Sequence, residues 1–450
     1  MARVIAIDEL LRGSNTAAAQ RERNLSHLLM AFIGAGLAFM LLPGTFLGVW
    51  NLFAISSRHS SQSVSDAWIQ AHGHAQVFGW IGCFLLGIGY HSLPKMTGSG
   101  SRVVTGRAIF SLTTWISGVT LRWFANIYLW HWRVLLPVSA ALEIAAFLVF
   151  FRVVSQHKPS EGAKSKLEPW IFLVIAGTLG WLATLAMNFY GCLQVALHSA
   201  TPAFPFGFDQ KFLVLMGWAF LVPNVWGFSA KWLPIFLGLK PVRSRLLLGA
   251  VQANTTGVVL AAIGATPFAT VLLTCGTVLA VIALRVFETP EREAKIQGVH
   301  ASFPFFIRLS YVWLHIAALL AIWAADSKNA TGIWGASRHA LTVGFISAMV
   351  FCVGQRILPA FSGMKLLWST RLMFANTALL AVGCTLRVSS EVLAYQGFSA
   401  HAWSLLPISA VVEMTAVTLF AFNLVLTFMQ DPAHAIRLRQ EAATARAAVS

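Results

Sequence analysis

One apolar segment occurs twice in the sequence, as HAQVFGWIGCFLLGIGYHSLPKM (residues 74–96) and as HALTVGFISAMVFCVGQRILPAF (residues 339–361). Both copies begin on histidine and carry Leu-Pro near their end. The similarity continues beyond these copies, because Leu121-Arg122 recurs as Leu386-Arg387 at the same offset. In addition, LPVSAALE at 136–143 recurs as LPISAVVE at 406–413. This self-similarity indicates internal repetition.

A fainter middle copy, FLVLMGWAFLVPNVWGFSAKWLPIF, begins at Phe212. Its Pro234 corresponds to the prolines of the other two copies, and Val214 replaces their first histidine. The chain therefore reads as three related units of about four helices each, over residues 27–154, 169–287 and 304–430.

The composition indicates a membrane protein. Hydrophobic residues make up 57% of the 450 and charged residues only 11%, and the mean hydropathy is +0.71. Such a chain is too apolar for a water-soluble globule and is suited to a lipid bilayer. Apolar runs of about 20 residues, the length that crosses the hydrocarbon layer, predict an all-α polytopic domain with twelve transmembrane helices. The predicted helices are 27–53, 69–92, 107–130, 134–154, 169–192, 210–233, 245–265, 267–287, 304–325, 338–359, 370–392 and 402–429.

The basic residues predict the orientation. Of 32 lysines and arginines, 25 fall on the side shared by the two termini, so both termini are expected in the cytoplasm. Residues 1–26 and 431–450 are then a cytoplasmic N-terminal segment and a cytoplasmic tail around a single domain, 27–430. This distribution also accounts for the net charge of +16 without a nucleic-acid partner. The five cysteines show no CxxC spacing and indicate neither disulfides nor a zinc site.

His74 and His339 are the main candidate ligands. Each lies a few residues past the outer end of its predicted helix, so the two imidazoles are expected at one depth. Neutral imidazole is a good iron ligand, and a matched pair predicts bis-histidine ligation of a b-type haem. Arg122 and Arg387 are expected at a matched level, where guanidinium groups are suited to holding propionates. The alternatives are histidines hydrogen-bonded to carbonyls and arginines that anchor the membrane interface.

These motifs resemble haem-copper oxidase subunit I, whose second helix likewise begins on histidine and continues through Phe-Gly to Leu-Pro. The resemblance implies twelve helices in three arcs and low-spin haem ligands at His74 and His339. The stretches SYVWLHIAALLAIWAA (310–325) and RHALTVGFISAMV (338–350) look still more like the NnrS family, membrane haem proteins associated with denitrification and nitric-oxide stress. This resemblance implies a bacterial inner membrane and a role in electron transfer or nitric-oxide handling.

The sequence departs from the oxidases at their catalytic centre. No histidine occurs between His198 and His300, and Asp209-Gln210-Lys211 stands where helix 6 begins. Ser337 replaces the second haem ligand of helix 10. Copper therefore has no oxidase-type ligands here, and proton-pumping oxygen reduction is not expected.

Other polar residues offer weaker candidates. His72 lies two positions before His74, so its side chain should face a different cavity about 200° away; the alternative is an exposed interfacial histidine. His131 and His401 begin predicted helices at the outer surface, where they could bind a metal ion with His198 or belong to an aromatic belt. Glu143 and Glu413 are repeat-related carboxylates inside the membrane and must be protonated or paired.

The favoured function is a membrane haem protein that exchanges electrons with a cytochrome or quinol donor, or handles nitric oxide. If it is an enzyme, it is a haem-dependent oxidoreductase. A secondary transporter without haem is the first alternative, because internal repeats and intramembrane carboxylates also occur there. A structural subunit with a relic haem site is the second.

Overall fold

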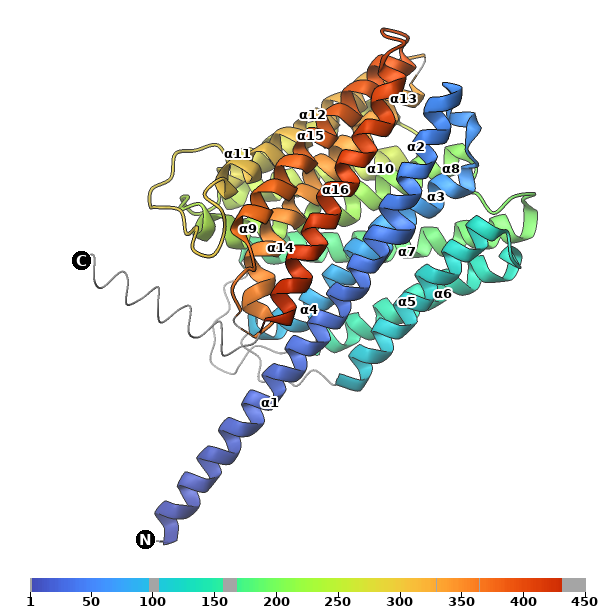
Figure 1. The fold of residues 1–450 in the computed structure, drawn as a ribbon. Coiled ribbons are helices and arrows are strands. Elements are labelled where there is room, and N and C mark those ends of the chain that lie inside the picture. Colours follow the sequence, from blue (N-terminus) through green and yellow to red (C-terminus); the bar gives the residue numbers. More distant parts are fainter. Residues whose placement is uncertain (1, 97–104, 157–167, 329, 364, 431–450) are drawn as a thin grey trace.

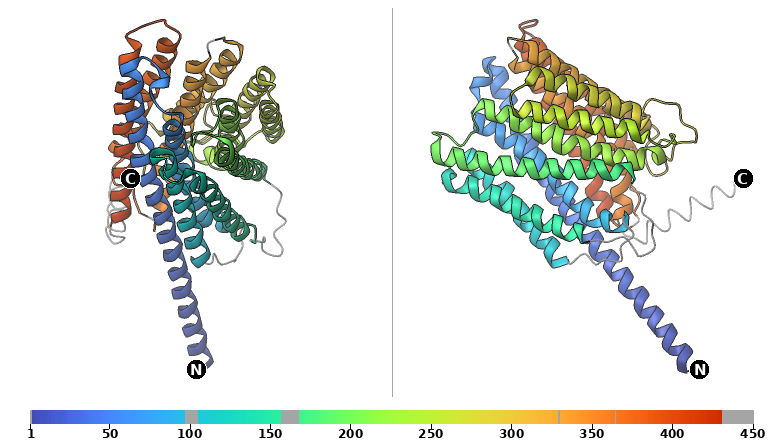
Figure 2. Two further views of the ribbon diagram at one scale, coloured as in Figure 1. Left: turned by 90° about the vertical axis from the view of Figure 1, so that its right-hand side faces the viewer. Right: turned by 180° about the vertical axis from the view of Figure 1, so that it is seen from behind.

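The computed structural model describes residues 2–96, 105–156, 168–328, 330–363 and 365–430, and this part of the chain is helical without any strand (Figure 1). The long helices lie side by side in one bundle, as the two further views in Figure 2 also show. The helices are α1 Ala2–Phe39, α2 Leu47–Arg58, α3 Asp66–His74, α4 Cys83–Met96, α5 Thr105–Tyr128, α6 Trp132–Ser155, α7 Pro169–His198, α8 Phe206–Val214, α9 Val222–Phe236, α10 Ser244–Ala262, α11 Thr266–Leu284, α12 Phe303–Asp326, α13 Thr331–His339, α14 Ala348–Phe361, α15 Thr370–Tyr395 and α16 Ala402–Met429.

Within the described ranges, nine continuous helical stretches are long and apolar enough to cross a membrane. The multi-pass prediction is therefore confirmed. The other three predicted spans fall on α3 to α4, α5 and α10, which are not among these nine, so twelve crossings stay a prediction. The N-terminal helix also begins much earlier than predicted, at Ala2, and runs out of the bundle (Figure 1). The predicted tail at 431–450 lies outside the described residues.

Helices from the two ends of the chain, α2 and α16, are neighbours in the bundle. Helix α2 packs along α16, so that the blue and red ends of the chain lie side by side (Figure 1). Two hairpins with equivalent contacts flank the repeated segments. Gly118 of α5 packs against Glu143 of α6, and Gly383 of α15 packs against Glu413 of α16; in each case an added Cβ would lie within 3 Å of the glutamate Cγ. Glycine therefore allows close helix contact at both repeat-related positions.

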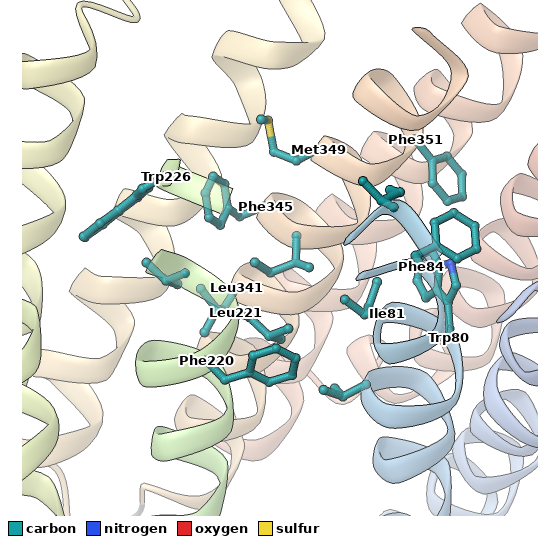
Figure 3. Close-up of a cluster of buried hydrophobic side chains, with 14 of the residues drawn as sticks. Trp80, Ile81, Phe84, Phe220, Leu221, Trp226, Leu341, Phe345, Met349 and Phe351 are labelled. Carbon is teal, nitrogen blue, oxygen red and sulfur yellow. The ribbon is translucent and has the colours of Figure 1, made fainter. Parts of the chain in front are cut away.

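Three helices contain a π-helical stretch at the corresponding place. These stretches are η3 (Ala75–Gly82), η4 (Leu215–Leu221) and η5 (Ala340–Ser347), and they begin directly after His74, Val214 and His339. A fourth, η1 (Met40–Phe46), contains Pro43, which explains the local loss of α-helical hydrogen bonds there. Such stretches often mark functional sites. The side chains of η3, η4 and η5 meet in the apolar centre of the bundle (Figure 3).

Candidate functional site

Two groups of polar side chains, most of them buried, lie beside the repeated segments. The first, the Glu143 cluster, consists of His74, Arg122, Glu143, Asn188 and Cys192, from helices α3, α5, α6 and α7. The second, the Arg387 cluster, consists of His72, His339, Arg387, Glu391 and Glu413, from helices α3, α13, α15 and α16. Helix α3 contributes one histidine to each cluster.

The Glu143 cluster is centred on a carboxylate with no solvent exposure. His74 Nε2 donates to Glu143 Oε1 at 2.7 Å, and Asn188 Nδ2 donates to Glu143 Oε2 at 3.0 Å. The His74 ring stacks on Phe78, with 4.3 Å between ring centroids. Both carboxylate oxygens thus have partners, as a buried charge requires, and the nitrogen of His74 that would bind iron is occupied.

Arg122 completes this cluster and is only 2% exposed. Its guanidinium lies 4.6 Å above the centroid of the Phe204 ring and donates to Asn188 Oδ1 and Cys192 Sγ. Its Nε is buried without a partner. The position of Arg122 is therefore inside the bundle, and it is not an interfacial anchor.

In the Arg387 cluster, His339 has the hydrogen bonding of a metal ligand. Its Nδ1 donates to the Gly335 carbonyl at 2.9 Å and lies 3.1 Å from Glu391 Oε2. Its Nε2 accepts from Arg387 NH2 at 3.5 Å. The proton is thus on Nδ1 and the lone pair on Nε2, which is the tautomer that coordinates a metal through Nε2.

His72 has an equivalent arrangement on α3. Its Nδ1 donates to the Gly44 carbonyl in η1 at 2.9 Å, and its ring packs on Gly48 of α2, where an added Cβ would lie 2.6 Å from His72 Cε1. Its contacts with Gly44 and Gly48 set His72 apart from His74, which lies against Glu143. As predicted from the helical angle, His72 and His74 face different compartments.

Buried polar groups in the Arg387 cluster lack partners. Arg387 is 7% exposed and makes one long contact with His339 and one with Glu391, both at 3.5 Å, while its Nε and NH1 have no hydrogen bond. Glu413 Oε1 is also buried without a hydrogen bond. Unsatisfied buried donors are costly, and an anionic ligand beside Arg387 would satisfy them.

The remaining predicted residues lie elsewhere. His131 and His401 are exposed at the starts of α6 and α16. Among the residues that the structure describes, no three His, Cys, Asp or Glu side chains are grouped to hold a metal ion, so an outer-surface metal site gains no support. Sequence reasoning missed Glu391 and Asn188. Glu391 follows Arg387 by one helical turn, a spacing that could have indicated their contact.

One comparison with known proteins shows the fold, and none shows the activity. The sequence model of a family described as "Domain of unknown function (DUF8744)" matches residues 167–429, and no curated protein matches the sequence. A solved chain described as part of a heme-copper terminal oxidase dimer superposes with a TM-score of 0.66 at 12% identity, covering 90% of this chain and 84% of that chain. The predicted similarity of fold to a haem-copper oxidase chain is thereby confirmed. Neither comparison names the NnrS family.

Proposed function

The chain belongs to the DUF8744 family of unknown function, and we propose that it is a membrane haem protein that binds a b-type haem in the Arg387 cluster. The observation that carries the proposal is that His339 lies against an under-satisfied arginine and, like His72, donates its Nδ1 proton to a backbone carbonyl. Both imidazoles bond a backbone carbonyl through Nδ1, and buried Arg387 has two nitrogen donors without partners.

These side chains fit the chemistry of a haem. Neutral imidazole with its Nδ1 proton held by a carbonyl is oriented to coordinate iron through Nε2. The free donors of Arg387 suit a propionate carboxylate. Glu391, beside His339 Nδ1, would increase the basicity of that ligand. When bound, the haem supplies one-electron exchange between ferric and ferrous iron.

The second histidine in this proposal differs from the one that the sequence favours. The sequence favours His74 opposite His339, but His74 Nε2 lies 2.7 Å from Glu143 Oε1, whereas His72 donates its Nδ1 proton to a carbonyl as His339 does. We therefore assign the ligation to His72 and His339. Arg122, predicted to hold a propionate, then serves the Glu143 cluster instead.

The role that follows is electron transfer or nitric-oxide handling in a bacterial inner membrane, with a cytochrome or quinol as electron donor. Iron with two histidine ligands exchanges electrons readily but binds a gas only after losing one of them. Because the histidines of an oxidase copper site are missing from the sequence, copper has no part in the proposal. The NnrS resemblance supports the nitric-oxide alternative.

The test is the absorption spectrum of the purified protein with single alanine replacements. Wild type should show reduced b-type haem bands, and both His339→Ala and His72→Ala should lose them or convert them to a high-spin form. His74→Ala should retain them, as should the exposed control His131→Ala. Loss of the bands in His74→Ala with retention in His72→Ala would reverse the ligand assignment. A wild-type protein that folds fully but shows no haem absorption would support the transporter alternative.

A further inference from the structure

A cavity of about 80 Å³ lies between the helices that carry the three π-helical stretches. Its walls come from η3 and α4, from η4 and α9, and from η5 and α14. They include Ile81, Phe84, Leu221 and Met349, which are labelled in Figure 3. The cavity contains none of the residues of the Glu143 or Arg387 clusters. It is therefore a separate feature of the bundle centre.

The walls of the cavity are almost entirely apolar. Three lining residues, Asn224, Ser229 and Trp232, carry polar groups. Asn224 Nδ2 donates to the Phe220 carbonyl at 2.7 Å, and Ser229 Oγ accepts from the Tyr311 hydroxyl at 2.7 Å. A buried water needs two to four polar partners, and cavities that lack them stay dry and bind small apolar molecules.

The size of the cavity restricts its ligand. An apolar cavity of about 150 Å³ accepts benzene or xenon, and the space here is about half as large. Molecules of two or three heavy atoms without charge fit this limit, whereas a quinone ring or a folded acyl chain exceeds it. Such a ligand gains dispersion contacts with the apolar side chains that line the cavity.

We propose that this cavity is a binding site for a small uncharged gas. Its lining contacts the ligand only through apolar side chains, so size and low polarity determine which molecules bind. The physiological ligand class rests on the proposed function, which names nitric oxide, a diatomic molecule of suitable size. Binding itself requires no haem, and the site can therefore be tested independently of the Arg387 cluster.

The experiment is ¹²⁹Xe NMR of the full chain in detergent micelles, with xenon as the probe. Wild type should show a saturable bound-xenon signal distinct from xenon dissolved in micelles. Val350→Phe places a ring in the cavity and should lower the xenon affinity by at least about tenfold. The matched control is Val259→Phe, because Val259 is 54% exposed on the outside of the bundle; it should leave binding unchanged.

Each other outcome is decisive. Val225→Phe fills the same cavity from α9 and replaces Val350→Phe if that variant does not fold. Absence of saturable xenon binding to wild type overturns the proposal, as does unchanged binding in both filling variants. An acyl chain detected in the cavity by native mass spectrometry, lost in Val350→Phe, would also overturn it. If xenon binds but the protein never shows haem bands, only the proposed function fails.

Discussion

Replacing Glu143 by glutamine should destabilise the protein, whereas the repeat-related Glu413→Gln should not. Glu143 has no solvent exposure and accepts hydrogen bonds from His74 and Asn188 at 2.7 and 3.0 Å. Glutamine keeps one acceptor oxygen but turns an amide donor toward the other partner, which is itself a donor. The loss is therefore one hydrogen bond to a charged group, worth about 1.5–3 kcal/mol.

Glu413 provides the matched control. Its Oε1 is buried without a hydrogen-bond partner, so glutamine at that position breaks no bond to this atom and removes a charge that is costly to bury. Its stability should stay equal or increase. The assay is the free energy of unfolding from SDS titration in mixed micelles, followed by far-UV circular dichroism. Equal losses in the two variants, or no loss in Glu143→Gln, would refute the assignment of Glu143 as a fully paired carboxylate.

Two further predictions concern other contacts. Gly335→Ala would place a Cβ 1.9 Å from Glu391 Oε1, so the Glu391 carboxylate must move away from His339. We expect the variant to retain haem more weakly on dilution. The control Gly354→Ala, whose added Cβ would lie 3.7 Å from its nearest neighbour, should behave as wild type. The hydrogen bond from Arg285 lowers the pKa of Glu288 in the connection after α11. A lowered carboxyl pKa stabilises the folded state above the unfolded pKa, and this contribution disappears as pH falls through the folded value. Unfolding of wild type and Glu288→Gln should therefore differ near neutral pH and converge in acid; a difference that is constant with pH would contradict this.

The sequence predicted the positions of the helices better than the contacts of the polar residues. Hydropathy placed the predicted spans within several residues of helices, because a run of apolar side chains long enough to cross lipid has few alternatives. The repeat identified His339, Arg387 and Glu143, which all lie in polar clusters, the last two of them buried. Partner choice could not be predicted, because it depends on the rotation of helices about their axes.

The case of α3 shows this limit clearly. His72 and His74 are two residues apart and differ little in sequence context, so the repeat alone favoured His74. The structure brings His74 to Glu143 and directs His72 toward the Gly44 carbonyl. Only the packing of α3 between its neighbours decides which ring belongs to which cluster, and no local pattern records that packing.

The number of residues in the π-helical stretch η3 sets the rotation of α3, which carries these histidines, relative to α4. Each residue of an α-helix turns the chain by about 100°, so removing one residue from Ala75–Gly82 would restore regular winding and rotate α3 by that angle relative to α4. Neither His72 nor His74 would then point into its present compartment. The segment Ala75–Gly82 should therefore tolerate substitutions far better than the deletion of a single residue.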